Sequence, residues 1–258
     1  MTRTTSITKL IVLTIALAVV VGVTLPASAG VVRTWDNGSS ANSNWNNATN
    51  WSSNSRPGQN DRARFTGSKT NPTLNANQDV EEINFDSGST KNWSILASGS
   101  NYITLRGNYN GAGMGIWVEN TTQTNRYFTI NPRIHVYNSQ EWRVQNSNHS
   151  GSDLILKGDI TDRTTKTITK TGDGTIKLMT VDKNIDGGWR IEEGVVWADG
   201  VHLGNAGCDV TITGGSLQLN SNQTLDNIYV DGGTLNIDGG NLTVDILRLR
   251  ENGVMTTD

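Results

Sequence analysis

The chain has 258 residues, with 24 acidic and 21 basic side chains, and this small net charge of −3 excludes an electrostatic case for binding nucleic acid. Asn, Ser, Thr and Gly are abundant, yet β-branched residues recur at short intervals, which argues against a disordered chain. The single cysteine, Cys208, excludes an internal disulfide, so stability must come from packing and backbone hydrogen bonds.

The first 29 residues have the pattern of a bacterial secretory leader. Arg3 and Lys9 form a basic start, residues 10–23 are an apolar stretch, and Ala-Ser-Ala at 27–29 is a cleavage site. The apolar stretch is shorter than the roughly 18–20 residues of a membrane-spanning helix, so a retained anchor is the weaker interpretation. We therefore expect an exported chain that starts at Gly30, with no stable membrane insertion after cleavage.

Residues 30–66 form a segment rich in Trp and Asn, with turn residues near its end. Trp35, Trp45 and Trp51 lie among Asn, Ser and Gly. Buried Trp rings cover large apolar areas, and exposed ones stack on sugar rings. We expect this segment to cap the N-terminal end of the fold, since an uncovered sheet edge invites pairing with other chains. Ligand contact by these three Trp, with a glycan, is the alternative.

From residue 63 onward, short alternations of apolar and polar residues predict one strand after another, and no convincing helical stripe appears. The expected strands after Ala63–Phe65 are Val80–Phe85, Trp93–Ala97, Tyr102–Leu105, Gly115–Val118, Tyr127–Ile130, Ile134–Tyr137, Glu141–Val144, Leu154–Lys157, Thr167–Lys170, Thr175–Met179, Trp189–Ile191, Val195–Ala198, Val210–Thr213, Ser216–Leu219, Ile228–Val230, Thr234–Ile237, Leu242–Val244 and Ile246–Leu249.

The C-terminal half repeats a strand, a Gly-rich corner and a second strand. Gly215 follows Gly194 by 21 residues, and Gly233 follows Gly215 by 18. A period near 20 with one such unit per repeat indicates a solenoid, in which stacked units share one core. Glycines at the corners favour positive φ, which glycine adopts at little cost. We expect residues 67–258 to form an all-β solenoid.

Two segments carry a family resemblance. Residues 170–178, KTGDGTIKL, together with the later Gly-rich turns, resemble the autotransporter-associated β-strand repeat. The upstream run from Trp35 to Phe65 is similar to the Trp/Asn-rich opening found before such repeats in large exported bacterial proteins. The resemblance implies a right-handed parallel β-helix that is secreted or surface-exposed, acting as a passenger or stalk without catalysis.

The residues that could carry chemistry are scattered. Asp residues at the corners either form a row of calcium ligands or simply favour turns, and the turn interpretation is preferred. Glu192 and Glu193 are neighbours that point to opposite faces of a strand, a poor catalytic pair. Arg248 and Arg250 share one strand face, where we expect them to be solvated. Cys208 is expected to be a small buried residue without a His partner.

These observations predict a secreted or cell-surface structural or adhesive module, without catalytic activity, metal or cofactor. Its expected partners are a cell-surface glycan or other surface proteins. A carbohydrate-binding module with exposed Trp and a β-helix polysaccharide lyase or hydrolase are the alternatives. The sequence reaches Asp258 just after a strand and without a polar capping unit, so we expect either a fragment or an end closed by a partner.

Overall fold

The computed structural model describes residues 30–108, 113–119, 126–145, 154–162 and 165–257. These residues are nearly all β-structure, with two short 3-10 helices, η1 (Ala48–Asn50) and η2 (Ser52–Asn54). Among them, no helix is long and apolar enough to cross a membrane. The expected leader, residues 1–29, lies outside the described residues.

Within the described ranges the strands form three sheets, and every pairing between these strands is parallel. The ten-stranded sheet contains β1 (Val32–Thr34), β2 (Arg62–Gly67), β5 (Glu82–Ser89), β8 (Met114–Val118), β11 (Gln140–Val144), β14 (Ile168–Thr171), β16 (Trp189–Ile191), β18 (Val210–Ile212), β20 (Gln223–Asp231) and β22 (Leu242–Arg250). The nine-stranded sheet contains β3 (Thr73–Leu74), β6 (Trp93–Ala97), β9 (Phe128–Ile130), β12 (Leu154–Leu156), β15 (Thr175–Leu178), β17 (Val195–Ala198), β19 (Ser216–Leu219), β21 (Thr234–Ile237) and β23 (Val254–Thr257). The four-stranded sheet contains β4 (Gln78–Val80), β7 (Tyr102–Leu105), β10 (Arg133–Val136) and β13 (Ile160–Asp162).

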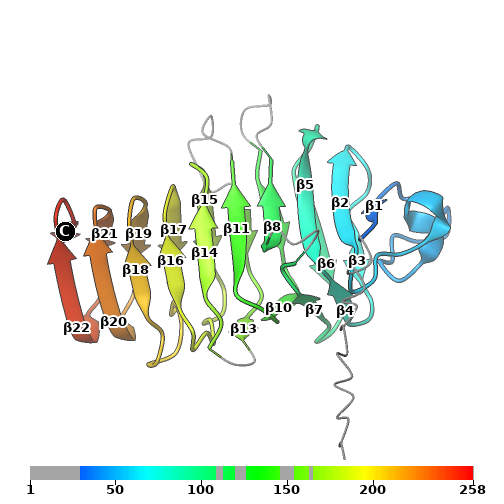
Figure 1. The fold of residues 1–258 in the computed structure, drawn as a ribbon. Helices are drawn as coiled ribbons and strands as arrows, with labels where there is room; N and C mark the ends of the chain where they lie inside the picture. Colours follow the sequence, from blue (N-terminus) through cyan, green and yellow to red (C-terminus); the bar gives the residue numbers. More distant parts are fainter. Residues whose placement is uncertain (1–29, 109–112, 120–125, 146–153, 163–164, 258) are drawn as a thin grey trace, which may run out of the picture.

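From β2 to β13 the chain visits these sheets in a constant order, and we call each pass a rung. Rung 1 is β2–β4, rung 2 is β5–β7, rung 3 is β8–β10 and rung 4 is β11–β13. Rung 5 begins with β14 and β15 and runs on to Asn184, which bridges to Thr161 of β13. Later rungs begin with β16, β18, β20 and β22, and all rungs lie side by side in Figure 1. The expected all-β, parallel, β-helix-like architecture is confirmed.

Alternation along each strand places one set of side chains in a continuous core. In β15, Ile176 and Leu178 are buried while Thr175 and Lys177 face outward. Ile176 is in register with buried Val196 of the next rung. Because neighbouring strands lie about 4.8 Å apart, each inward position becomes a column of stacked apolar side chains. No rung could bury such a face by itself.

Three Trp rings pack together beside the first strands of this core. Trp51 makes edge contacts with Trp35 and Trp45 at centroid distances of 5.1 and 4.8 Å, and Trp45 packs on Phe65 of β2 at 5.6 Å. The indole of Trp51 donates to the Trp45 carbonyl at 2.7 Å. The ten-stranded sheet already includes β1 and β2, so it begins inside the segment 30–66.

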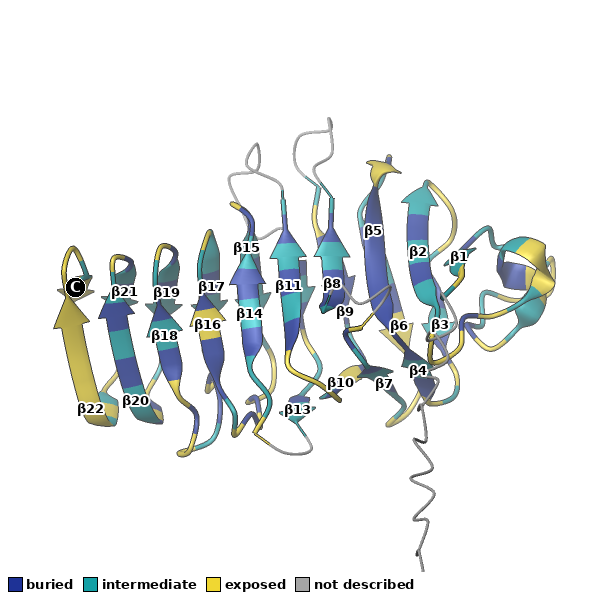
Figure 2. Ribbon diagram, in the orientation of Figure 1, coloured by how far each residue is buried: buried dark blue, intermediate teal, exposed yellow. Residues whose placement is uncertain are grey.

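At the opposite end, the last rung leaves its inward positions open. Leu247 and Leu249 of β22 are in register with Ile228 and Val230 of β20, which are fully buried. Leu247 is nevertheless 39% exposed and Leu249 is 49% exposed. Figure 2 shows β22 exposed along most of its length, in contrast to the buried strands before it.

The repeating glycines have two different physical reasons. Gly194 has φ of +65°, as expected for a corner glycine. Gly215 and Gly233 are not in that region, so the expectation of positive φ is wrong for them. A Cβ on Gly215 would lie 2.8 Å from the Gly194 carbonyl oxygen, and one on Gly233 would lie 2.5 Å from that of Gly215. Close approach between rungs therefore excludes a side chain at these two positions.

Carboxylates at the corners clamp successive rungs together. Asp Oδ1 atoms accept hydrogen bonds from Asn Nδ2 atoms one rung later, at distances of 2.7–2.9 Å. The pairs are Asp159–Asn184, Asp186–Asn205, Asp199–Asn220 and Asp209–Asn227. Each of these Asp residues lies at a corner of its own rung and binds an Asn side chain of the next rung.

Candidate functional site

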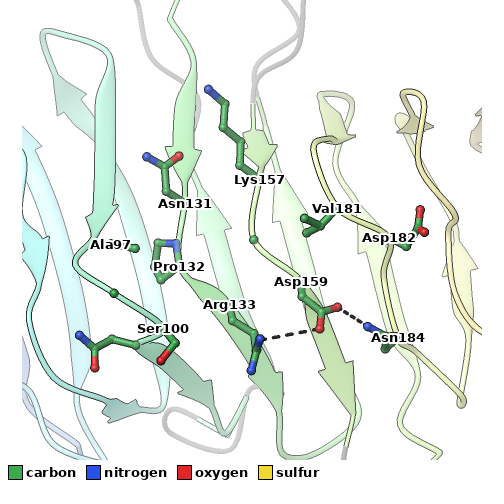
Figure 3. Close-up of a pocket in the computed structure, with 13 residues that line it drawn as sticks. Ala97, Ser100, Asn131, Pro132, Arg133, Lys157, Asp159, Val181, Asp182 and Asn184 are labelled. Atoms are coloured by element: carbon green, nitrogen blue, oxygen red, sulfur yellow. Dashed lines mark hydrogen bonds and ion pairs between the residues drawn. The ribbon is translucent and has the colours of Figure 1, made fainter.

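A cleft among the described residues crosses four successive rungs on one edge of the fold (Figure 3). It has a volume of about 580 Å³. Its lining comes from residues 97–101 in rung 2, 131–133 in rung 3, 157–159 in rung 4 and 181–184 in rung 5. Since each rung contributes one segment, the cleft runs across the strands.

Each lining segment follows a strand of the nine-stranded sheet, where the chain turns toward the next sheet. Gly99 makes this turn in rung 2 with φ of +68°. Pro132 makes it in rung 3, and Gly158 lies against it: a Cβ on Gly158 would be 2.2 Å from the Pro132 carbonyl oxygen. The closely packed Pro132 and Gly158 form the floor of the cleft, and the polar side chains of the neighbouring residues line its walls.

Polar contacts across the rungs hold part of the cleft wall in place. Asp159 lies between Arg133 and Asn184, as Figure 3 shows. Its Oδ2 is 3.8 Å from the Arg133 Nε, and its Oδ1 accepts from the Asn184 Nδ2 at 2.9 Å. Arg133, Asp159 and Asn184, from three consecutive rungs, therefore form one chain of polar contacts, which we call the polar ladder.

A buried lysine supports the floor beneath this ladder. Lys183 is only 1% exposed, and its Nζ donates to the carbonyls of Gly158 and Met179 at 2.7 and 3.2 Å. Burial lowers the pKa of Lys183 to about 8, although the nearby Asp159 and Asp182 act in the opposite direction. Its ammonium group fastens rung 5 to the turn of rung 4.

Several polar groups of the cleft keep unused hydrogen-bonding capacity within the described structure. The Oδ1 of Asn131 is buried and accepts no hydrogen bond there. Lys157 is exposed and makes no ion pair with another described residue. Asp182 has a side chain that is 59% exposed; its Oδ1 accepts from the backbone N–H of His202 at 2.7 Å, and its Oδ2 lies 3.7 Å from the His202 Nδ1. These side chains can therefore still donate hydrogen bonds to a ligand or accept them from one.

The Trp residues singled out in the sequence lie elsewhere. Trp35, Trp45 and Trp51 come together in one cluster, but they are 1%, 0% and 0% exposed. A sugar ring cannot reach their faces in this arrangement, so the geometry that glycan stacking needs is absent at all three. The outward-facing Trp residues are Trp117 in β8 and Trp197 in β17.

Alternation could have identified those two residues from the sequence. Trp197 lies between the inward-facing Val196 and Ala198, so it must face outward. The structure places the Lys177 ammonium 3.7 Å from its ring centroid. The cleft itself gives no comparable signal, because its residues are separated by turns whose register the sequence does not reveal.

The remaining candidates do not form a reactive cluster. Glu192 pairs with Arg190 at 2.6 Å, while Glu193 accepts from the backbone N–H of Gly172 at 2.9 Å. Burial raises the pKa of the Cys208 thiol to about 12, so it stays protonated. Arg248 and Arg250 are exposed. Over the described ranges, no group of three or more His, Cys, Asp or Glu residues is placed to hold a metal ion.

No protein-family model, curated protein or solved structure matches this chain.

Proposed function

We propose that the chain is an exported, right-handed parallel β-helix that acts as a structural or adhesive module at a bacterial surface. The observation that carries this proposal is the uninterrupted parallel stacking of rungs around one apolar core. Such a stack is rigid, elongated and able to display side chains at regular intervals. The leader-like residues 1–29 and the resemblance to exported repeat proteins support the location.

The described acidic residues favour a scaffold over an enzyme. Asp186, Asp199 and Asp209 are used as clamps between rungs. Glu192 and Glu193 are engaged with different partners rather than facing a shared substrate. We propose that the Trp cluster closes the N-terminal end and that the outward faces contact a surface glycan or another surface protein.

Export can be tested by expressing the full chain with its leader in a bacterial host. We expect the product to begin at Gly30 and to leave the cytoplasm. The variant Leu17→Arg interrupts the apolar stretch and should keep Met1 and remain inside the cell. Full-length wild-type protein that stays in the cytoplasm would contradict the proposal.

The adhesive role needs a separate measurement. Beads coated with the processed protein should bind to bacterial cells more strongly than beads coated with heat-unfolded protein. Equal binding by both preparations would remove the adhesive role and leave only a structural one.

A further inference from the structure

The cleft repeats a similar geometry in each rung that it crosses. Pro132 of rung 3 is in register with Asn101 of rung 2 and with Gly158 of rung 4, as the pairing of the following strands requires. The floor is therefore a row of equivalent positions, one per rung. Adjacent positions are about 4.8 Å apart, which is the spacing of neighbouring strands.

This spacing favours one kind of linear ligand. An extended peptide advances about 3.3 Å per residue, so its groups would fall out of step with the rungs. The rung spacing is instead close to the length of one hexose unit in an extended polysaccharide. A sugar chain that lies along the cleft would place one unit over each rung.

The charges of the lining indicate a neutral ligand. The cationic Arg133 and Lys157 are balanced by the anionic Asp159 and Asp182. A polyanion or a polycation would meet as much repulsion as attraction on this surface. The other polar groups are amides and a hydroxyl, which donate and accept hydrogen bonds as sugar hydroxyls do.

One buried atom gives independent support. The Oδ1 of Asn131 is out of contact with solvent, yet it receives no hydrogen bond. A buried acceptor without a donor costs about 1–3 kcal/mol, so native structures rarely retain one without a reason. Asn131 as a whole is only half-buried, so a rotation of its side chain would turn this oxygen into the cleft, where a ligand hydroxyl would supply the donor.

We propose that this cleft binds a linear, neutral polysaccharide whose sugar units lie across rungs 2 to 5. Asn131 accepts from one hydroxyl once its side chain rotates toward the cleft, and Asp182 and Lys157 offer further polar contacts in rungs 5 and 4. The ladder of Arg133, Asp159 and Asn184 keeps the wall rigid. This binding site goes beyond the scaffold role proposed above, and it gives that scaffold a ligand class.

The test is affinity electrophoresis of the processed chain in gels containing galactomannan, mixed-linkage β-glucan or polygalacturonate. At least one of the two neutral polymers should retard the wild-type protein, and polygalacturonate should not. Ser100→Trp places a bulky ring in the cleft mouth and should weaken binding at least tenfold. Asn131→Leu keeps the volume of the side chain, removes only the unpaired acceptor and its amide, and should weaken binding several-fold.

Ser40→Trp is the matched control, because it makes the same substitution at an exposed Ser outside the cleft lining. It should bind like the wild type, and circular dichroism should show that all variants keep their strands. The proposal is overturned if neither neutral polymer retards the protein, if only polygalacturonate does, or if Ser100→Trp binds normally. Those outcomes concern the soluble chain alone and leave the export and scaffold proposal to its own tests.

Discussion

Among the described residues, Glu82, Lys170 and Lys183 are fully buried ionisable side chains, and the first two are stabilised in different ways. Glu82 in β5 is 0% exposed and pairs with Arg62 of β2 at 2.9 Å. Lys170 in β14 is also 0% exposed, and its Nζ donates to the carbonyls of Thr171, Gly172 and Glu193. Buried charges are costly unless they are paired, so both positions allow sharp tests.

Glu82 should make stability depend on pH. Burial raises its pKa from 4.5 to about 7, and Arg62 offsets this only in part. The folded protein therefore holds the proton at a pH where the unfolded chain has released it. Protonated Glu82 therefore adds about 3 kcal/mol to the free energy of unfolding, relative to the ionised form. This gain is fully present below pH 4.5 and is lost as the pH rises through 7.

Urea denaturation at pH 5 and pH 8 measures this effect. Glu82→Gln should lose less stability between the two pH values than the wild type does. Glu192→Gln, on a partly exposed side chain, should keep the wild-type difference. An unchanged pH dependence in Glu82→Gln would refute the assignment.

Lys170→Met should be much more damaging than Lys177→Met. The first change leaves three carbonyls without their donor and should lower the free energy of unfolding by roughly 3 kcal/mol or more. Lys177 lies on the outer face, where it contacts Trp197 and pairs with Asp199, so its loss should cost about 1 kcal/mol. Guanidinium denaturation compares the two, and equal losses would count against the buried role of Lys170.

At the scale of the element, the rung is held to its neighbour by side chains as well as by backbone. The Asp–Asn clamps join positions 18 to 25 residues apart in sequence. A hydrogen bond of this kind contributes about 1 kcal/mol to the free energy of unfolding. Several of them along one edge of the stack oppose the sliding of one rung past the next.

A double-mutant cycle tests one clamp. For Asp186 and Asn205, whose atoms are 2.7 Å apart, we expect a coupling energy of about 0.5–1.5 kcal/mol. The cycle uses Asp186→Ala, Asn205→Ala and the double variant in chemical denaturation. Asp186 with the unrelated Asn236→Ala serves as the control pair and should show no coupling. Strictly additive losses for Asp186 and Asn205 would show that the clamp contributes nothing.

Most strands could be predicted from the sequence, because alternation is a local property. Trp93–Ala97, Val195–Ala198 and Ser216–Leu219 match β6, β17 and β19. The expected strand Val80–Phe85 is instead divided at Glu81, where the chain turns from β4 to β5. Apolar residues continue through this corner, so the pattern alone could not reveal it.

Other differences have the same origin. The alternation predicts two strands, Leu242–Val244 and Ile246–Leu249, but they join in β22 (Leu242–Arg250). The short β3 (Thr73–Leu74) and β13 (Ile160–Asp162) had no periodic signal at all. The cleft cannot be predicted from the sequence, because its four segments meet only once the register of the rungs is set.

At the scale of the whole molecule, contacts run mainly between neighbouring rungs, so stability should be local along the stack. Trp51→Ala removes a buried ring that contacts Trp35, Trp45 and Phe65, at a cost of about 3–5 kcal/mol. We expect this cost to appear at the N-terminal end without opening distant rungs.

Hydrogen exchange followed by mass spectrometry measures this locality. In Trp51→Ala, exchange should accelerate in residues 30–74 and stay unchanged in residues 189–237. Trp189→Ala, which removes a buried ring from a central rung, should instead accelerate exchange around β16. Uniform acceleration in both variants would indicate that the stack unfolds as one cooperative unit.

The cluster of Trp35, Trp45 and Trp51 also has an optical consequence. Indole rings that meet edge to face at about 5 Å, as the Trp51 pairs do, couple their electronic transitions. Such coupling gives an exciton band in circular dichroism that disappears when the rings separate. The Trp142–Trp189 pair, at 5.6 Å in the middle of the stack, also contributes to this band. The part of the band that Trp51→Ala removes therefore reports the fraying of the N-terminal end without any attached label.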